Sequence, residues 1–122
     1  LDREVKPLEI AKRYFTSREF SALQATPEGA RATAFFAGWT RKEAIVKARG
    51  ITMAESLATL SVDLDPRAIH PWHEDSPEAP ARPPCRLTAF LRPDWKLIGA
   101  AALCGDQPPR LRFTVVSGSR FD

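Results

Sequence analysis

Hydrophobic side chains in the first part of the chain recur at the spacing of helices. Leu8, Ala11 and Phe15 fall at positions i, i+3 and i+7, and this pattern predicts a helix over residues 7–15. The sequence Thr-Ser-Arg-Glu follows directly with the spacing of a capping box. It predicts a second helix over about residues 17–24.

A longer helix is predicted next. Thr26 fits the N-cap position and Pro27 the first helical position, where a missing backbone N–H is tolerated. The helix can continue to about Ala48, and Gly50 is a natural C-terminal stop. Residues 53–57 are expected to add one further turn.

The pattern changes from helical to alternating in the second half. Residues 58–64 alternate apolar and polar side chains, as a half-buried strand does. Prolines then break the segment 66–84, which is predicted to be a proline-rich loop. The remaining expectations are β-like runs at 86–92, 95–103 and 110–116, a hairpin connection at 105–109 and a frayed tail at 117–122.

This order of elements predicts an α+β fold in which helices pack on a small antiparallel sheet. The 122 residues fit a single domain, 1–122. The hydrophobic fraction of 43% and the charged fraction of 27% are those of globular proteins and not of disordered ones.

Charge and hydropathy restrict the class of partner. The net charge of +3 favours an acidic or phosphorylated partner but is too small to demand nucleic acid, and no nucleic-acid recognition motif is present. No apolar run approaches the roughly 18 residues of a membrane span, and no signal-peptide pattern opens the chain. We therefore expect a cytoplasmic protein with no nucleic-acid or membrane partner.

Two groups of residues invite a redox or metal interpretation. Cys85 and Cys104 lie in a chain without disulfide-rich character, so they are predicted to be reduced, buried thiols. His70 and His73 have H-x-x-H spacing, but they lie in the proline-rich loop without a nearby cysteine. A solvated loop is favoured there over a metal site, and the role of the two histidines stays open.

One ridge of the long helix combines aromatic and charged residues. Phe35, Trp39, Glu43 and Lys47 are spaced four apart, and the aromatics indicate that the ridge faces the protein body. Glu43 and Lys47 then occupy positions where a helix normally places leucine. From spacing alone, an ordinary i, i+4 salt bridge at the mouth of a groove is favoured. The alternative is a carboxylate that holds a divalent cation beside a lysine that meets phosphates.

Two motifs carry a resemblance to a known family. The segment WTRKEAIVK at 39–47, closed by Gly50, resembles the W-x-x-K-E-A-x-x-K signature of the 4′-phosphopantetheinyl transferases, in their larger Sfp-like class. The segment IAKRYFTSRE at 10–19 resembles a second motif of that class, at the customary distance before the signature. The resemblance covers residues 8 to about 60 well and the remainder weakly.

The resemblance implies a reaction and a set of site residues. The reaction is transfer of 4′-phosphopantetheine from coenzyme A to a serine of an acyl or peptidyl carrier protein, with release of 3′,5′-ADP. Glu43 matches the Mg²⁺-binding glutamate, which is also proposed to help activate the serine, and Lys47 matches a lysine near the diphosphate. Trp39 and Lys42 match positions that line the coenzyme A side of the site.

The sequence also departs from the family pattern. Such enzymes are about twice this length and consist of two similar halves, of which this chain resembles the C-terminal one. Their other metal-binding element, Asp-x-Glu, precedes the segment where this chain begins, and Asp2 and Glu4 have its spacing without its apolar neighbours. Thr52 stands where the family often has a second glycine. We therefore expect a partial enzyme, inactive alone and completed by a missing N-terminal half or a homodimer partner. The alternative is a non-catalytic module for carrier-protein binding or dimerisation.

Overall fold

The computed structural model describes residues 7–56, 59–95, 97–105 and 116–120. The α-helices come first along the chain and the strands follow, so the α+β prediction is confirmed. The helices are α1 Pro7–Tyr14, α2 Ser17–Ala25, the 3₁₀ turn η1 Glu28–Ala30, α3 Arg31–Arg49, α4 Met53–Ser56 and the 3₁₀ turn η2 Pro93–Trp95. The strands are β1 Leu60–Val62, β2 His73–Asp75, β3 Cys85–Arg92, β4 Leu97–Cys104 and β5 Val116–Arg120.

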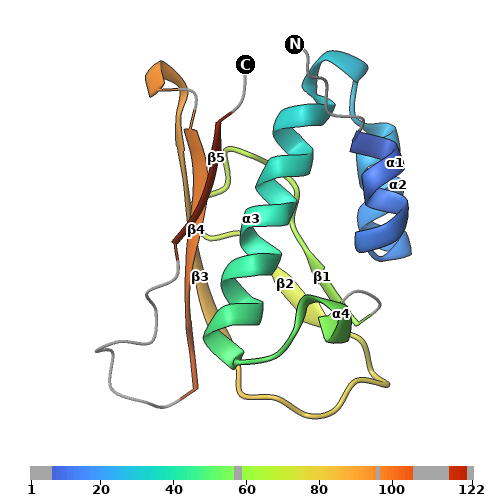
Figure 1. Cartoon of the computed structure of the whole chain (residues 1–122), viewed down its shortest axis with the longest axis vertical. Coiled ribbons are helices and arrows are strands. Elements are labelled where there is room, and N and C mark those ends of the chain that lie inside the picture. Colours follow the sequence, from blue (N-terminus) through green and yellow to red (C-terminus); the bar gives the residue numbers. More distant parts are fainter. Residues whose placement is uncertain (1–6, 57–58, 96, 106–115, 121–122) are drawn as a thin grey trace.

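The strands form two small antiparallel sheets on either side of α3. One sheet pairs β1 with β2, and the other has the order β3-β4-β5. Figure 1 shows α3 running between the three-stranded sheet on one side and α1, α2 and the two-stranded sheet on the other. Both sides of α3 are covered, so this helix is the central element of the fold.

The buried face of α3 toward the sheet is built from small residues. Ala37 and Ala44 of α3 are buried, and Ala100 and Ala102 of β4 are buried as well. Small side chains on both surfaces let the helix approach the strand closely. The core continues into Leu23 of α2 and other large side chains at both sheets.

Local signals explain most helix boundaries. The Thr16 hydroxyl accepts a hydrogen bond from the Glu19 backbone N–H, and the Glu19 carboxylate accepts one from the Thr16 N–H, so the predicted capping box is confirmed. Gly50 adopts φ +72° after the last turn of α3, where a residue without Cβ avoids strain, and its N–H donates to carbonyls of that turn. The predicted C-terminal stop is confirmed.

The predicted start of the long helix was wrong. Thr26 is the C-cap of α2, its N–H donates to the Leu23 carbonyl and its hydroxyl to the Ala22 carbonyl. The chain then passes through η1 before α3 begins at Arg31. A threonine hydroxyl can cap the end of the preceding helix as well as the start of the next one. The spacing of residues does not show which of the two Thr26 caps.

Two segments predicted to be irregular contain strands. Strand β2 lies within the predicted loop 66–84, because residues 72–76 are free of proline and can pair with β1. Strand β5 covers most of the tail 117–122 that was predicted to fray, and it pairs with β4. The predicted strand 110–116 lies outside the described residues except for Val116, as does the hairpin connection except for Gly105.

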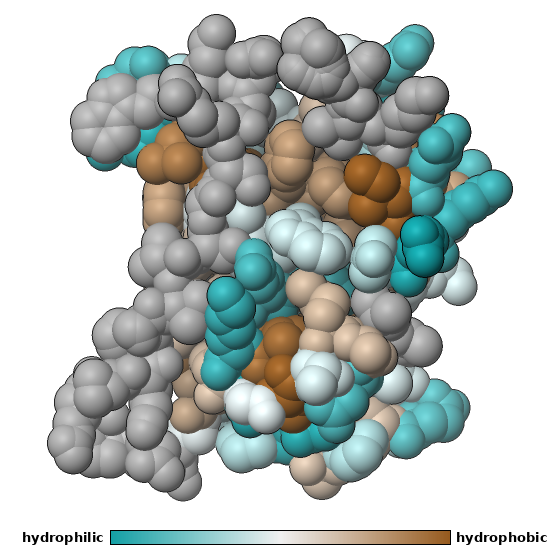
Figure 2. All heavy atoms as spheres, in the orientation of Figure 1, coloured by the Kyte–Doolittle hydropathy of each residue, from teal (hydrophilic) through white to brown (hydrophobic). Residues whose placement is uncertain are grey.

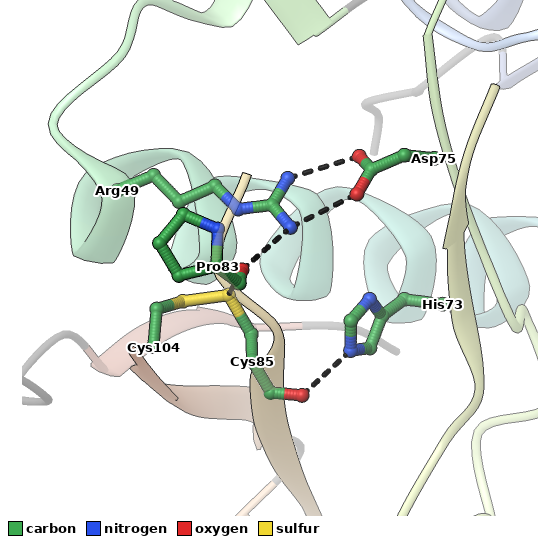
Figure 3. Close-up of a disulfide and its surroundings, with 6 residues drawn as sticks. All are labelled: Arg49, His73, Asp75, Pro83, Cys85 and Cys104. Atoms are coloured by element: carbon green, nitrogen blue, oxygen red, sulfur yellow. Dashed lines mark hydrogen bonds and ion pairs between the residues drawn. A yellow bond between two sulfur atoms is a disulfide. The ribbon is translucent and has the colours of Figure 1, made fainter. Parts of the chain in front are cut away.

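The cysteines form a disulfide, which corrects the prediction of reduced thiols. Cys85 and Cys104 face each other across β3 and β4 (Figure 3). The Gly105 N–H donates to the Pro84 carbonyl just outside them, so the two cysteines form a non-hydrogen-bonded pair, in which side chains lie closest. Composition and a separation of 19 residues did not reveal this register.

A stacked group of aromatic rings joins α1 to α3. The ring of Trp39 lies edge-on to that of Tyr14, with centroids 5.3 Å apart, and stacks on Phe35 at 6.2 Å. Phe35 in turn stacks on Phe15 at 5.3 Å. The aromatic half of the ridge therefore packs into the protein body as predicted, and Trp39 serves this packing.

We predict that the disulfide stabilises the fold. Replacing Cys85 and Cys104 by alanine removes a link across 19 residues and should lower the free energy of unfolding by about 3 kcal/mol, because the unfolded chain regains entropy. Urea denaturation measures the change, and reduction of the unaltered protein should produce a similar loss. Equal stability of the oxidised and reduced proteins would contradict the prediction.

We also predict that Trp39 contributes more to stability than the exposed Trp72. Trp39→Ala should lower the free energy of unfolding by about 3 kcal/mol, because it opens a cavity among aromatic rings. Trp72→Ala is the matched control and should cost about 1 kcal/mol or less, since Trp72 is 41% exposed and its ring contacts the Arg18 guanidinium at 4.1 Å. Equal losses measured in urea would show that Trp39 does not have this packing role.

Candidate functional site

The ridge of α3 passes from the core to the surface. Phe35 is buried and Trp39 half-buried, whereas the side chain of Glu43 is 27% exposed and that of Lys47 is 60% exposed. The Lys47 Nζ lies 3.4 Å from the Glu43 Oε2, which is the i, i+4 salt bridge expected from the spacing. The aromatic residues had suggested that the charged half of the ridge lies inside the protein body. It lies at the edge instead.

Lys42, for which the resemblance implies a place on the coenzyme A side of the site, lies in the core. Its side chain is 0% exposed, and its Nζ donates to the Glu19 Oε1 at 2.6 Å. Burial lowers the pKa of Lys42 below its ordinary value, while the charge of Glu19 and the hydrogen bond to it act in the opposite direction. From this position the ammonium group is not available to a ligand at the surface.

Glu19 makes contacts that its place in the capping box does not predict. Its carboxylate was expected only to complete the capping box of α2, but it accepts three hydrogen bonds. The donors are the Thr16 N–H at 2.8 Å, the Lys42 Nζ at 2.6 Å and the Val62 N–H of β1 at 2.7 Å. The signal in the sequence was its position as the last residue of the segment 10–19, the first of the two motifs.

The C-terminal end of α3 is held by a second buried cation. Arg49 binds both carboxylate oxygens of Asp75 in β2, at 2.9 and 3.0 Å, and also donates to the Pro83 carbonyl (Figure 3). The His73 Nε2 lies 2.8 Å from the Cys85 carbonyl oxygen beside this pair. The end of α3, strand β2 and the start of β3 are thereby tied together next to the disulfide.

Thr52 has a structural use of its own. Its hydroxyl accepts a hydrogen bond from the Glu55 N–H, and the Glu55 carboxylate accepts one from the Thr52 N–H. The hydrogen bond from the Thr52 backbone N–H to the carboxylate lowers the pKa of Glu55 below its ordinary value. Thr52 therefore begins α4 with a reciprocal cap, which a glycine at this position would not make.

The described side chains offer a divalent cation one suitable ligand on α3. Glu43 presents a partly exposed carboxylate on a helix whose other faces are packed, and carboxylate oxygens are ligands that Mg²⁺ prefers. Among the described residues, no group of three or more His, Cys, Asp or Glu is arranged to hold a metal ion, His70 and His73 included. Asp2 and Glu4 lie outside the described part of the chain. Glu43 thus fits as one ligand of a site.

Two grooves lie away from Glu43 and Lys47. One, of about 470 Å³, is lined largely by polar residues of α1, α2 and β2, including Arg13 and Ser17. The other, of about 550 Å³, runs between α2, the start of α3 and the segment after β1, and it includes Leu64 and Trp72. On the face shown in Figure 2, hydrophobic side chains lie in separate areas divided by hydrophilic ones. Neither groove is lined by Glu43 or Lys47.

Comparison with known proteins places these motifs in a family. The family model of the 4′-phosphopantetheinyl transferase superfamily matches residues 1–83. The chain is 32% identical to the 4′-phosphopantetheinyl transferase Sfp of Bacillus subtilis over 97 residues, covering 78% of this chain and 41% of that protein. It is 31% identical to the 4′-phosphopantetheinyl transferase HetI of Nostoc over 96 residues, covering 79% of this chain and 37% of that protein.

The remaining comparisons set limits on this relationship. The chain spans about two fifths of the length of these curated relatives. No solved structure gave a significant match. Within the described residues, none of the helices has the length and apolar character needed to cross a membrane. The motif match, the extent of the family match and the two relatives agree: the chain belongs to the 4′-phosphopantetheinyl transferase superfamily.

Proposed function

We propose that this chain takes part in transferring 4′-phosphopantetheine from coenzyme A to a serine of an acyl or peptidyl carrier protein, with Mg²⁺ as the cofactor. The observation that carries the proposal is the placement of the family motif. Glu43 and Lys47 stand one turn apart at the surface end of a ridge whose aromatic end packs into the core. A carboxylate and an ammonium group on a rigid helix can act on a metal-bound diphosphate.

The reaction assigns a task to each of these side chains. The serine oxygen forms a bond to the phosphorus that carries pantetheine, the bond from that phosphorus to the bridging diphosphate oxygen breaks, and 3′,5′-ADP leaves. Bound Mg²⁺ would neutralise charge on the diphosphate. Glu43 would hold the cation and help to take the serine proton, while Lys47 would stabilise negative charge on the phosphate oxygens.

The remainder of the site is proposed to come from outside this chain. The chain spans about two fifths of its relatives, and the described residues contribute one fitting carboxylate and no acidic cluster. We propose that this chain corresponds to one half of a two-half enzyme of cytoplasmic location. A second half or a second copy would then supply further metal ligands and much of the donor site, and the chain alone would be inactive.

A second candidate function is a non-catalytic module that binds a carrier protein or a partner copy. The same observation favours it, since one carboxylate without an acidic cluster among the described residues does not make a metal site by itself. The two functions differ in whether coenzyme A binds in a Mg²⁺-dependent way and whether Glu43 is needed for that binding.

We predict that transfer depends on Glu43. In the full-length protein, Glu43→Gln should lower kcat/KM by about 100-fold, because a neutral amide is a poor ligand for Mg²⁺ and a poor base. The measurement is the conversion of an apo carrier protein to its holo form, followed by mass spectrometry with coenzyme A and Mg²⁺. The free energy of unfolding should change by about 0.5 kcal/mol, the size of an i, i+4 salt bridge such as the one between Glu43 and the exposed Lys47.

Glu78→Gln is the matched control for this prediction. Glu78 is exposed and bonds only locally to Ser76 among the contacts described, so the same loss of charge should leave transfer unchanged. A folded Glu43→Gln protein with unaltered kcat/KM would refute the assignment of Glu43. Mg²⁺-independent binding of a carrier protein without any transfer would favour the second candidate function.

A further inference from the structure

We propose that the ion pair between Glu19 and Lys42 positions Glu43 for the reaction, and that Lys42 is a positioning residue which does not touch coenzyme A. The inference rests on the proposed function, because it concerns how the site of that reaction is held. It changes the role that the family resemblance implies for Lys42 and gives one to Glu19.

The first argument is the geometry of the pair. Both side chains are 0% exposed, and the Nζ and Oε1 are 2.6 Å apart. The carboxylate also binds the N–H groups of Thr16 and Val62, so one buried group joins α3 to the start of α2 and to β1. The two backbone N–H groups hold the Glu19 carboxylate in one place. The Lys42 side chain must therefore point to that place for its charge to be paired.

The second argument is that the other side of α3 offers little directional control. Where α3 packs on β4, buried alanines stand on both elements, including Ala44 and Ala100. Contacts between methyl groups are not directional, so they tolerate a rotation of the helix about its axis. Hydrogen bonds and ion pairs are directional, so the Glu19–Lys42 pair constrains that rotation. The bonds from Arg41 to the Asp63 carbonyl and from Arg49 to Asp75 act at other points of the same helix.

The third argument is the position of Glu43 directly after Lys42. Neighbouring residues of an α-helix diverge by about 100°, so directing Lys42 toward Glu19 determines where Glu43 emerges. A rotation of ~20° at the outer radius of a helix moves a side-chain group by about 2 Å. A misplacement of about 1 Å at a reacting group can cost ~100-fold in rate.

The alternative is that the Lys42 ammonium binds the donor. The ammonium is buried, lies 5.5 Å from the centroid of the Phe15 ring and is bonded to Glu19. To reach a surface phosphate, the Lys42 ammonium would have to leave the carboxylate. The negative charge of Glu19 would then be buried without a cation. A buried pair is also not required for stability, because apolar replacements of such pairs are often as stable.

The test compares Lys42→Met with the double variant Glu19→Gln/Lys42→Met in the full-length protein. Lys42→Met should lower the midpoint of thermal unfolding, because the Glu19 charge loses its partner, and the double variant should recover most of the loss. The recovered double variant should keep KM for coenzyme A within about 2-fold while kcat falls by about 10-fold or more. Lys12→Met, which removes an exposed lysine, is the control and should not change the unfolding midpoint.

Two kinetic results would overturn the inference. A rise in KM for coenzyme A with unchanged kcat in the Lys42→Met and double variants would show that Lys42 binds the donor. Wild-type values of both constants in the double variant would show that the pair is only structural. If the double variant does not fold, Glu19→Asp replaces it. This variant keeps both charges with a shorter side chain and should lower kcat without raising KM.

A crystal structure of the double variant separates this inference from the proposed function. We expect α3 to be rotated relative to β4, with Glu43 displaced by about 1 Å or more. An α3 in its original orientation would overturn the positioning role whether or not the protein is active. Absence of transfer by the wild-type protein, in contrast, would refute the proposed function. The inference about the ion pair would then be decided by whether α3 is rotated in the double variant.

Discussion

The arrangement of the helices depends on a buried carboxylate. Glu19 caps α2, binds the ammonium group of Lys42 and accepts the backbone N–H of Val62, so α2, α3 and β1 meet at one side chain. A charge in the core is costly unless it is paired and hydrogen-bonded, and here each requirement is met by a different element. The same contact connects the two sequence motifs of the family, because Glu19 ends the first motif and Lys42 belongs to the second.

The ridge of Phe35, Trp39, Glu43 and Lys47 gains its rigidity from the elements packed around α3. The aromatic rings of Phe35 and Trp39 pack one part of α3 against α1, and Arg49 ties its end to β2. Glu43 and Lys47 lie between these two attachments, at the edge of the protein body. A site for phosphoryl transfer works mainly by positioning and electrostatics, so a helix fixed at several points is a suitable support for it.

Local chemistry made much of the fold predictable, and long-range pairing made the rest hard to predict. The capping box at Thr16 and the stop at Gly50 depend on neighbouring residues, so the sequence revealed both. The disulfide depends on the register of β3 and β4, and the burial of Lys42 depends on a carboxylate 23 residues away. Neither contact follows from periodicity. The ridge itself was predicted, but its charged end was placed too deep, because four-residue spacing does not show where a covering element ends.

The central claim is that Glu43 meets the metal while Lys42 stays on Glu19, and a crystal structure of the full-length protein with coenzyme A and Mg²⁺ tests it most directly. The account predicts a Glu43 oxygen about 2.1 Å from the cation, with the Lys42 Nζ still hydrogen-bonded to the Glu19 carboxylate. A Lys42 ammonium on a coenzyme A phosphate, or a cation bound without Glu43, would contradict it.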